Sequence, residues 1–346
     1  MNSLAKENVR TICYYSTKTG KVNWYFTSSR NNLDIKFSKE IRWKELKLNI
    51  ELASDLEVTS NDQDINTRKL LSQTQKISLL LSNLQIAIRR QNLNCAIEIA
   101  TQLYNIDQLG LLQKLSIISL DDVILLEDYP YLLFIITVYP TIKVELDMVL
   151  RIVECLVKSN RRDYLPDDDS FVVQNINLDF LIEIEKKNLN DLEISLIYSL
   201  YLRASYGGLD NDIYMLIGYC HLWKDRFMGQ NRDIWDNHLL KTPTTLDSKI
   251  AIEGETVSII QDSVNFYICP NMLKDININI NARCGCKINE DKLKKIIWYC
   301  SSGVNTRGNS KDFLQYRRKY YPVFAKLENI INTSINTYSS SKIKIE

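Results

Sequence analysis

Glycine and proline are scarce in this chain, and that scarcity constrains the fold more than any other feature. Only 10 glycines and 6 prolines occur in 346 residues. Both residues interrupt regular structure and supply turns, so a chain with so few of them favours long helices over a sandwich of many short strands. The length suits about two domains. We therefore expect a mainly α fold.

The charge and the cysteines limit the classes of protein. The chain has 43 basic and 42 acidic residues and a formal net charge of +1, so any nucleic-acid contact must come from a local patch. Eight cysteines are spread along the sequence, and MNSLAKENVR has no apolar core typical of a signal peptide. We expect reduced thiols and a cytoplasmic location. The longest apolar run, YLLFIITVY, is too short to cross a bilayer, so we expect no membrane contact.

The first 53 residues indicate a small β-containing module. Two aromatic and β-branched runs flank TKTGK, which predicts a hairpin with Gly20 in a left-handed turn position. The run IRWKELKLNIEL is a further candidate strand. We interpret the polar, breaker-rich residues 54–69 as a linker.

The spacing of apolar residues divides the rest of the chain into three regions. Residues 70–230 form a predicted helical domain, in which apolar side chains from Ile77 to Ile88 recur at helical spacing. Residues 231–334 form a mixed α/β region, because 251–270 alternates like a strand while 291–302 and 311–334 are helical in pattern. The last of these helices is expected to be interrupted or restarted at Pro322. Residues 335–346 are expected to form a flexible tail.

One segment resembles a known helical pattern. In residues 84–130 the resemblance is carried by Ala87–Arg90, by Ala96 with Ala100, by Leu115–Ile118 and by Asp121 with Asp122. The segment is similar to the C-terminal helical region of clamp-loader-type AAA+ recombination factors of the Werner-helicase-interacting protein family. The chain contains no Walker A sequence, so the resemblance implies an oligomerisation or lid-type helical fold without ATP hydrolysis.

A second resemblance extends over more of the chain. The order AIRR, RASYGG, VNFYICPNMLKDI and then Trp298–Arg307 resembles an uncharacterised protein family of large nucleocytoplasmic DNA viruses. Tyr267 stands where that family often has histidine, which argues against a metal or catalytic role there. The resemblance implies a place in the host cytoplasm or the virion and supplies no activity.

The sequence RASYGGLDND contains two adjacent glycines between helical patterns. Gly207 and Gly208 fit a tight corner in which backbones pack closely, and this is the favoured interpretation. The alternative is an anion site at the next helix start, with Arg203 one turn earlier. Asp210 and Asp212 argue against it, because they already place negative charge there.

Two other groups of residues are candidates for chemistry. Asp121 and Asp122 are expected at the start of a helix, where capping explains at least one of them. A four-thiolate zinc site is conceivable among four cysteines of the last third, although their spacing favours scattered thiols. These are Cys269, Cys284, Cys286 and Cys300.

The stretch LQYRRKYYP, residues 314–322, places cations beside tyrosines. This combination is typical of proteins that bind single-stranded nucleic acid. An amphipathic helix with a solvated basic face explains the same pattern. The predicted nucleic-acid-binding residues are Arg307, Tyr316, Arg317, Arg318, Lys319 and Tyr320.

These observations predict a non-catalytic, nucleic-acid-associated accessory protein of viral replication, recombination or genome handling. We expect DNA or RNA and protein as partners, a tendency to form homo-oligomers, and no cofactor. Two alternatives stay open: a structural or assembly protein of a large DNA virus that acts through protein contacts, and an enzyme whose motif is not readable.

Overall fold

A computed structural model describes most of the chain as two compact units. The described residues are 8–16, 20–25, 34–43, 46–54, 71–165, 178–230, 232–246, 260, 270–285 and 287–342. Unit 1 comprises Met1–Asp64, Leu115–Glu145 and Asp163–Thr242, and unit 2 comprises Ile65–Lys114, Leu146–Arg162 and Pro243–Glu346. Each unit collects three separate segments, so the division does not follow the contiguous ranges expected from the sequence.

Unit 1 contains the β-containing module. Its strands are β1 (Asn8–Tyr15), β2 (Val22–Tyr25), β3 (Ile35–Trp43) and β4 (Leu46–Ser54), in the order β2-β1-β4-β3. The predicted hairpin is confirmed: β1 and β2 pair antiparallel, and Gly20 has a φ of 65°. The strands β3 and β4 form a second antiparallel pair, and β1 and β4 run parallel to each other.

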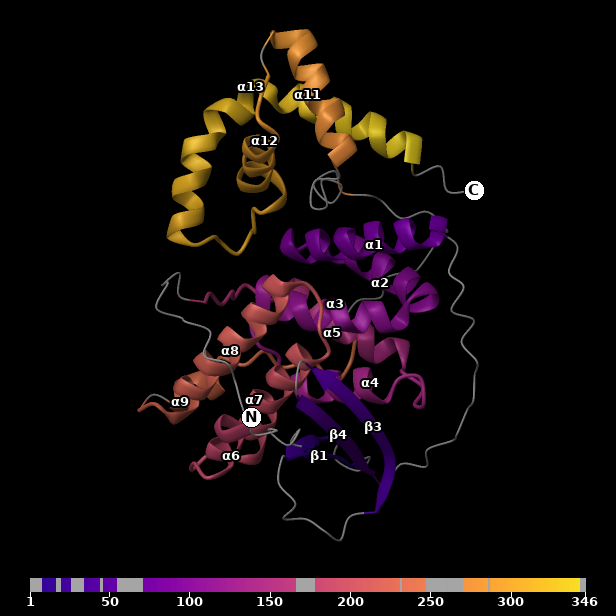
Figure 1. Cartoon of the computed structure of the whole chain (residues 1–346), viewed down its shortest axis with the longest axis vertical. Helices are drawn as coiled ribbons and strands as arrows, with labels where there is room; N and C mark the ends of the chain where they lie inside the picture. Colours follow the sequence, from indigo (N-terminus) through magenta and orange to yellow (C-terminus); the bar gives the residue numbers. More distant parts are fainter. Residues whose placement is uncertain are drawn as a thin grey trace, which may run out of the picture. The chain divides into compact units, whose positions relative to one another are not determined.

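Two helices pack on the sheet in unit 1, α4 (Tyr129–Val138) and α7 (Asp191–Ser205) (Figure 1). Trp24 of β2 forms a hydrogen bond with each of these two helices. Its indole Nε1–H donates to the carbonyl of Pro130 at 3.1 Å, and its backbone N–H donates to Ser195 Oγ at 3.0 Å. Trp24 is fully buried, so its polar atom is satisfied at the centre of the apolar core.

The other helices of unit 1 include one that contributes to a partly buried ion pair. They are α6 (Leu178–Glu185), α8 (Asp210–Met228) and α9 (Arg232–Asp236), while α3 (Gln108–Asp121) contributes residues to both units. Arg226 of α8 binds the Asp163 carboxylate through both terminal nitrogens. Its guanidinium lies 4.7 Å from the ring centroid of Trp223 and 4.1 Å from that of Trp235. The two rings thereby cover part of the Arg226–Asp163 pair and position the guanidinium.

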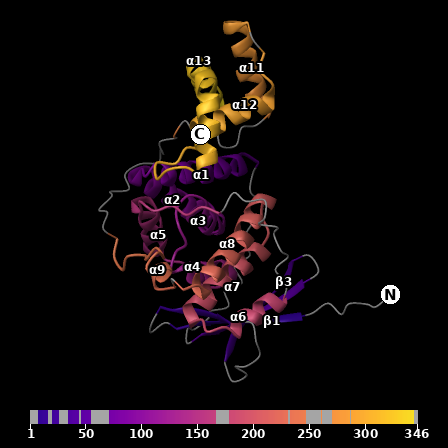
Figure 2. The ribbon, with the colours of Figure 1, turned by 90° about the vertical axis from the view of Figure 1, so that its left-hand side faces the viewer.

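Unit 2 is helical in all of its described elements. These are α1 (Leu71–Arg89), α2 (Leu93–Ile106), α5 (Leu146–Lys158), α11 (Pro270–Cys284), α12 (Glu290–Ile297), the π-helical turn η1 (Trp298–Ser302) and α13 (Lys311–Lys342). In Figure 2, α11, α12 and α13 lie together. They share a core that includes Leu273, Ile276, Ile297 and Ile331, all with no exposed surface.

The structure confirms the predicted fold class and changes several other expectations. The mainly α fold with a small N-terminal sheet is confirmed. Of the predicted strands in 251–270, the structure describes only Ile260 and Pro270, and Pro270 begins α11. Of the predicted linker 54–69, it describes only Ser54, the last residue of β4. Within the predicted helical domain, the region 178–205 holds two helices, α6 and α7. Asp121 is the last residue of α3 and Asp122 follows it, so the expectation of a helix start was wrong there.

The last helix is longer than the sequence suggested. It continues through Pro322 and reaches Lys342, so residues 335–342 of the predicted tail are helical and Ile335 is fully buried. Proline removes one backbone donor and its ring displaces the carbonyl four residues earlier, which bends a helix without necessarily ending it. Figure 1 shows α13 bending along its course. Among the described helices, none combines the length and apolar character needed to span a membrane.

Candidate nucleic-acid interface

A cluster of tyrosine rings lies where η1 meets the first turns of α13 in unit 2. The ring centroids of Tyr299 and Tyr316 are 5.0 Å apart, those of Tyr299 and Tyr320 are 5.7 Å apart, and those of Tyr316 and Tyr320 are 6.4 Å apart. The ring planes deviate from parallel by 14–24°. The three separations describe a triangle, so the rings form a compact group of nearly parallel planes and not a single column.

The three rings differ in exposure. Tyr320 is only 9% exposed and belongs to the core of the C-terminal helices, Tyr299 is half-buried, and Tyr316 is 44% exposed. Burial, followed by the nearby Tyr316 and Tyr320, raises the pKa of the Tyr299 phenol. A tyrosine hydroxyl is already protonated at neutral pH, and this shift keeps it so. Of the two tyrosines predicted from the sequence, Tyr316 is the one that offers a ring to a ligand.

Lysines flank the ring cluster on both helices. Lys295 and Lys292 lie four and seven residues before Tyr299, on the side of α12 that continues toward Tyr299 in η1. Lys319 lies three residues after Tyr316, with its Nζ 5.8 Å from the centroid of the Tyr320 ring. All three lysines are exposed.

These cations are not neutralised by nearby carboxylates. Within the described part of the chain, Lys292, Lys295, Arg318 and Lys319 form no ion pair. The stretch 311–326 holds five basic residues and one acidic residue, Asp312, in a chain whose net charge is only +1. The local excess of positive charge gives this surface the electrostatics that a phosphate backbone requires.

The consecutive cations predicted from the sequence do not share one face. Successive helical residues point about 100° apart, so Arg317, Arg318 and Lys319 face different directions. Arg317 is half-buried. Burial raises the pKa of the Cys300 thiol to about 11, and the positive charge of Arg317 opposes this increase. Arg317 therefore faces η1, while Arg318 and Lys319 are exposed.

Two arginines at the end of α1 hold the π-helical turn that carries Tyr299. Arg89 Nη1 donates to the carbonyl of Ser302 at 2.7 Å, and Arg90 Nη2 donates to the carbonyl of Ser301 at 2.8 Å. The Arg89 guanidinium also lies 5.6 Å from the ring centroid of Trp298. The sequence alone does not reveal this role, because the acceptors of Arg89 and Arg90 lie more than 200 residues away.

Arg307, also predicted to contact nucleic acid, is engaged inside unit 2. Its Nε donates to the carbonyl of Ser159 at 2.7 Å and its Nη1 to that of Ile88 at 2.9 Å. Its Nη2 donates to the carbonyls of Leu156 and Val157 at 2.6 and 3.0 Å. These carbonyls belong to the last turns of α1 and α5 and to the residue after α5, where helical carbonyls lack intrahelical partners. We therefore leave Arg307 out of the interface.

The glycine corner is explained by its backbone. Gly207 and Gly208 have φ values of 80° and 139°, and an added Cβ at either position would meet nothing within 4 Å. The expected close approach of backbones was therefore wrong, and the corner needs glycine for its left-handed angles. Arg203 is buried, and it donates from Nε to Ser116 Oγ at 2.8 Å and from Nη1 to the Gly207 carbonyl at 3.1 Å. The guanidinium thus holds the corner, and we assign no anion to it.

The structure describes only two of the four candidate zinc ligands. Cys284 is exposed and Cys300 is buried, while Cys269 and Cys286 lie outside the described ranges. In the part of the chain that the structure describes, no three His, Cys, Asp or Glu side chains could hold a metal ion.

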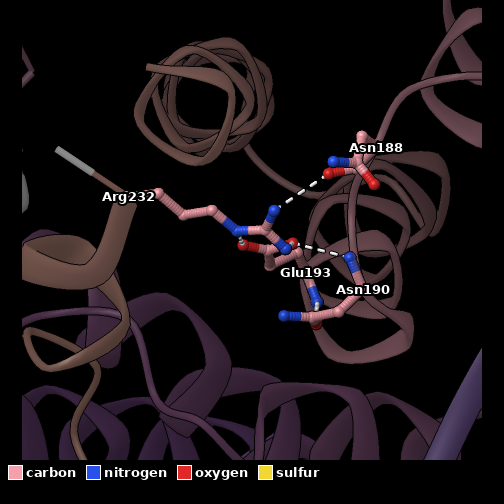
Figure 3. A network of polar contacts seen from close by, with 4 residues as sticks. All are labelled: Asn188, Asn190, Glu193 and Arg232. Atoms are coloured by element: carbon pink, nitrogen blue, oxygen red, sulfur yellow. Dashed lines mark hydrogen bonds and ion pairs between the residues drawn. The ribbon is translucent and has the colours of Figure 1, made fainter. Parts of the chain in front are cut away.

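A buried carboxylate that the sequence did not single out lies in unit 1 (Figure 3). Glu193 has no exposed surface and binds the Nε and Nη2 of Arg232 through its two oxygens. It also accepts from the backbone N–H of Asn190 at 2.7 Å, and Asn190 Oδ1 accepts from the Glu193 N–H at 2.9 Å. Arg232 Nη1 donates to the Asn188 carbonyl at 2.9 Å. Both carboxylate oxygens are occupied by this capping box and ion pair, so the group is structural.

Comparisons with family models, curated proteins and solved structures gave no match for this chain. The argument for a binding site therefore starts from the chain's own residues.

Proposed function

We propose that the protein is a non-catalytic nucleic-acid-binding accessory protein that contacts its ligand through α12, η1 and the first turns of α13. The observation that carries the proposal is the group of exposed, unneutralised cations beside a partly exposed ring cluster. Lysines attract the phosphate backbone by releasing its counterions, and rings add a contact that bare charge does not supply.

The biological role follows from the two resemblances. The clamp-loader-like helical segment and the resemblance to a family of large DNA viruses support a role in viral replication, recombination or genome handling. An accessory protein of this kind binds nucleic acid and other proteins and leaves the chemistry to a partner.

The test measures binding of labelled single-stranded and duplex DNA and RNA by fluorescence anisotropy at about 50 and about 200 mM salt. The variant is Lys292→Glu/Lys319→Glu. The control is Lys274→Glu/Arg283→Glu, which makes the same change in net charge at two exposed positions of α11.

The proposal predicts salt-sensitive binding by the wild type and by the control, and weaker binding by the Lys292/Lys319 variant. If two phosphate contacts are lost, the slope of log K against log salt should become shallower by about 1.4 for a single strand. Absence of binding by the folded wild type at low salt would contradict the proposal. Equal losses in the variant and the control would place the binding surface elsewhere. A stable assembly formed without nucleic acid, together with no binding, would favour the assembly alternative.

A further inference from the structure

We infer that this surface takes single-stranded nucleic acid, with one base stacked on the ring of Tyr316 and the flanking phosphates on Lys319 and the α12 lysines. This inference depends on the proposed function and specifies its ligand class. Base pairing and stacking within a duplex cover the faces of its bases, so a protein ring can stack only on an unpaired or terminal base.

Tyr316 has the geometry of a stacking platform. It is the most exposed of the three clustered rings, at 44%, and two nearly parallel neighbours pack against it. Tyr320 lies one helical turn later and is buried in the core of the C-terminal helices. Tyr299 belongs to η1, which Arg89 and Arg90 hold in place. A ring that is already oriented loses little conformational freedom when a base stacks on it.

The lysines lie where the sugar-phosphate chain on either side of the stacked base would pass. Lys319 is three residues after Tyr316 on the same side of α13. Lys292 and Lys295 are exposed on the side of α12 that continues toward Tyr299 in η1. Cations on both sides of a stacking ring suit an extended strand that crosses from one helix to the other. Asp312, four residues before Tyr316, lies on the same side of α13 and repels phosphate there.

Tyr321 provides a matched comparison on the same helix. It is 52% exposed, close to the exposure of Tyr316, and it sits next to the same basic residues. Five helical residues correspond to about 500° of rotation, so Tyr321 points about 140° away from Tyr316. No ring contact with the tyrosine cluster connects it to this surface among the described residues.

The experiment uses the full chain and three labelled probes of equal length, about 15 nucleotides. They are oligothymidylate, an abasic phosphodiester strand and a duplex. The proteins are the wild type, Tyr316→Ala, Tyr316→Phe and Tyr321→Ala, each checked for an unchanged thermal midpoint. The abasic strand separates stacking from charge, because it has phosphates and no bases.

The inference predicts that Tyr316→Ala weakens binding of oligothymidylate about 5- to 140-fold. It predicts a change of no more than about twofold for the abasic strand and the duplex, since a stacked base is worth about 1–3 kcal/mol. The abasic strand offers the ring no base, and the duplex offers only its terminal pairs. Tyr316→Phe keeps the ring and should bind oligothymidylate like the wild type. Tyr321→Ala should also bind normally.

Equal losses for all three probes, or no loss for oligothymidylate, would refute the stacking inference while the proposed function survives. A loss in Tyr321→Ala as large as that in Tyr316→Ala would also refute it, because the ring cluster would then have no special role. If the wild type binds none of the probes at low salt, the proposed function itself fails and the inference fails with it.

Discussion

Replacing Arg307 tests how unit 2 is held together. The guanidinium of Arg307 donates to four backbone carbonyls at 2.6–3.0 Å, and these carbonyls close the last turns of α1 and α5. Arg307→Ala leaves them without that partner, and each hydrogen bond to a charged group contributes about 1.5–3 kcal/mol at most. Arg307 is half-buried, so water replaces part of this contribution. We expect a loss of about 3 kcal/mol in the free energy of unfolding.

The assay is differential scanning calorimetry of the full chain. For a unit of about 150–250 residues, a loss of about 3 kcal/mol corresponds to a midpoint lower by about 6–12 °C. Arg307→Lys keeps the charge but not the planar guanidinium, so its midpoint should lie between those of the wild type and Arg307→Ala. The control is Arg283→Ala, which removes an exposed arginine from the end of α11. A decrease below about 2 °C for Arg307→Ala, or one equal to that of the control, would refute the reasoning.

Three further predictions concern other parts of the fold. Glu193→Ala removes the capping box and leaves Arg232 without its buried partner, so the free energy of unfolding by denaturant should fall by about 3–5 kcal/mol. The control Glu183→Ala, which breaks an exposed pair, should lower it by less than about 0.5 kcal/mol. Gly208→Ala should cost about 1–2 kcal/mol through its φ of 139° alone, because nothing crowds the added methyl group. The pKa of Cys300 is raised to about 11, so the folded state holds this proton more tightly than the unfolded chain does. The contribution of this proton to stability is complete below pH 9 and is lost as the pH rises to about 11. The thermal midpoint of Cys300→Ala should therefore fall less steeply than that of the wild type over that interval.

Local patterns were enough to predict most of the elements. The helical spacing from Ile77 to Ile88 matches α1, and the turn at Gly20 matches the β1–β2 hairpin. Both are set by residues within a few turns of one another. The continuation of α13 through Pro322 was missed, because a helix tolerates proline where tertiary packing holds both halves, as the burial of Phe324 and Ile331 does here.

The sequence predicted the kind of side chains in the candidate site but not all of its residues. The sequence placed tyrosines and cations together near residue 316, and the ring cluster contains Tyr316 and Tyr320. It missed Tyr299 as their partner, since η1 and α13 meet only in the folded unit. The signal that could have found Tyr299 was the pattern of Lys292 and Lys295 at helical spacing before it, a cationic face leading to a ring.

The arginines explain why a basic residue in the sequence is a poor guide to a binding surface. A guanidinium offers five donors, and in this protein Arg89, Arg203 and Arg307 use theirs on backbone carbonyls and a hydroxyl of distant or turned segments. Those acceptors exist only after folding, so sequence spacing cannot separate these arginines from ligand-binding ones. A cation available to a ligand is exposed and has no carboxylate or carbonyl partner among the described residues. Lys319 meets both conditions.

The same reasoning decides which substitution tests binding cleanly. Reversing the charge of Arg317 places a carboxylate beside the buried Cys300 and the turn η1, so a loss of binding would mix a damaged fold with a lost contact. Reversing Lys319 changes only an exposed side chain next to the Tyr320 ring. If the surface binds phosphate, Lys319→Glu should weaken binding at an unchanged thermal midpoint. Binding that is lost only in variants with a lowered midpoint would instead assign this whole basic stretch to the fold.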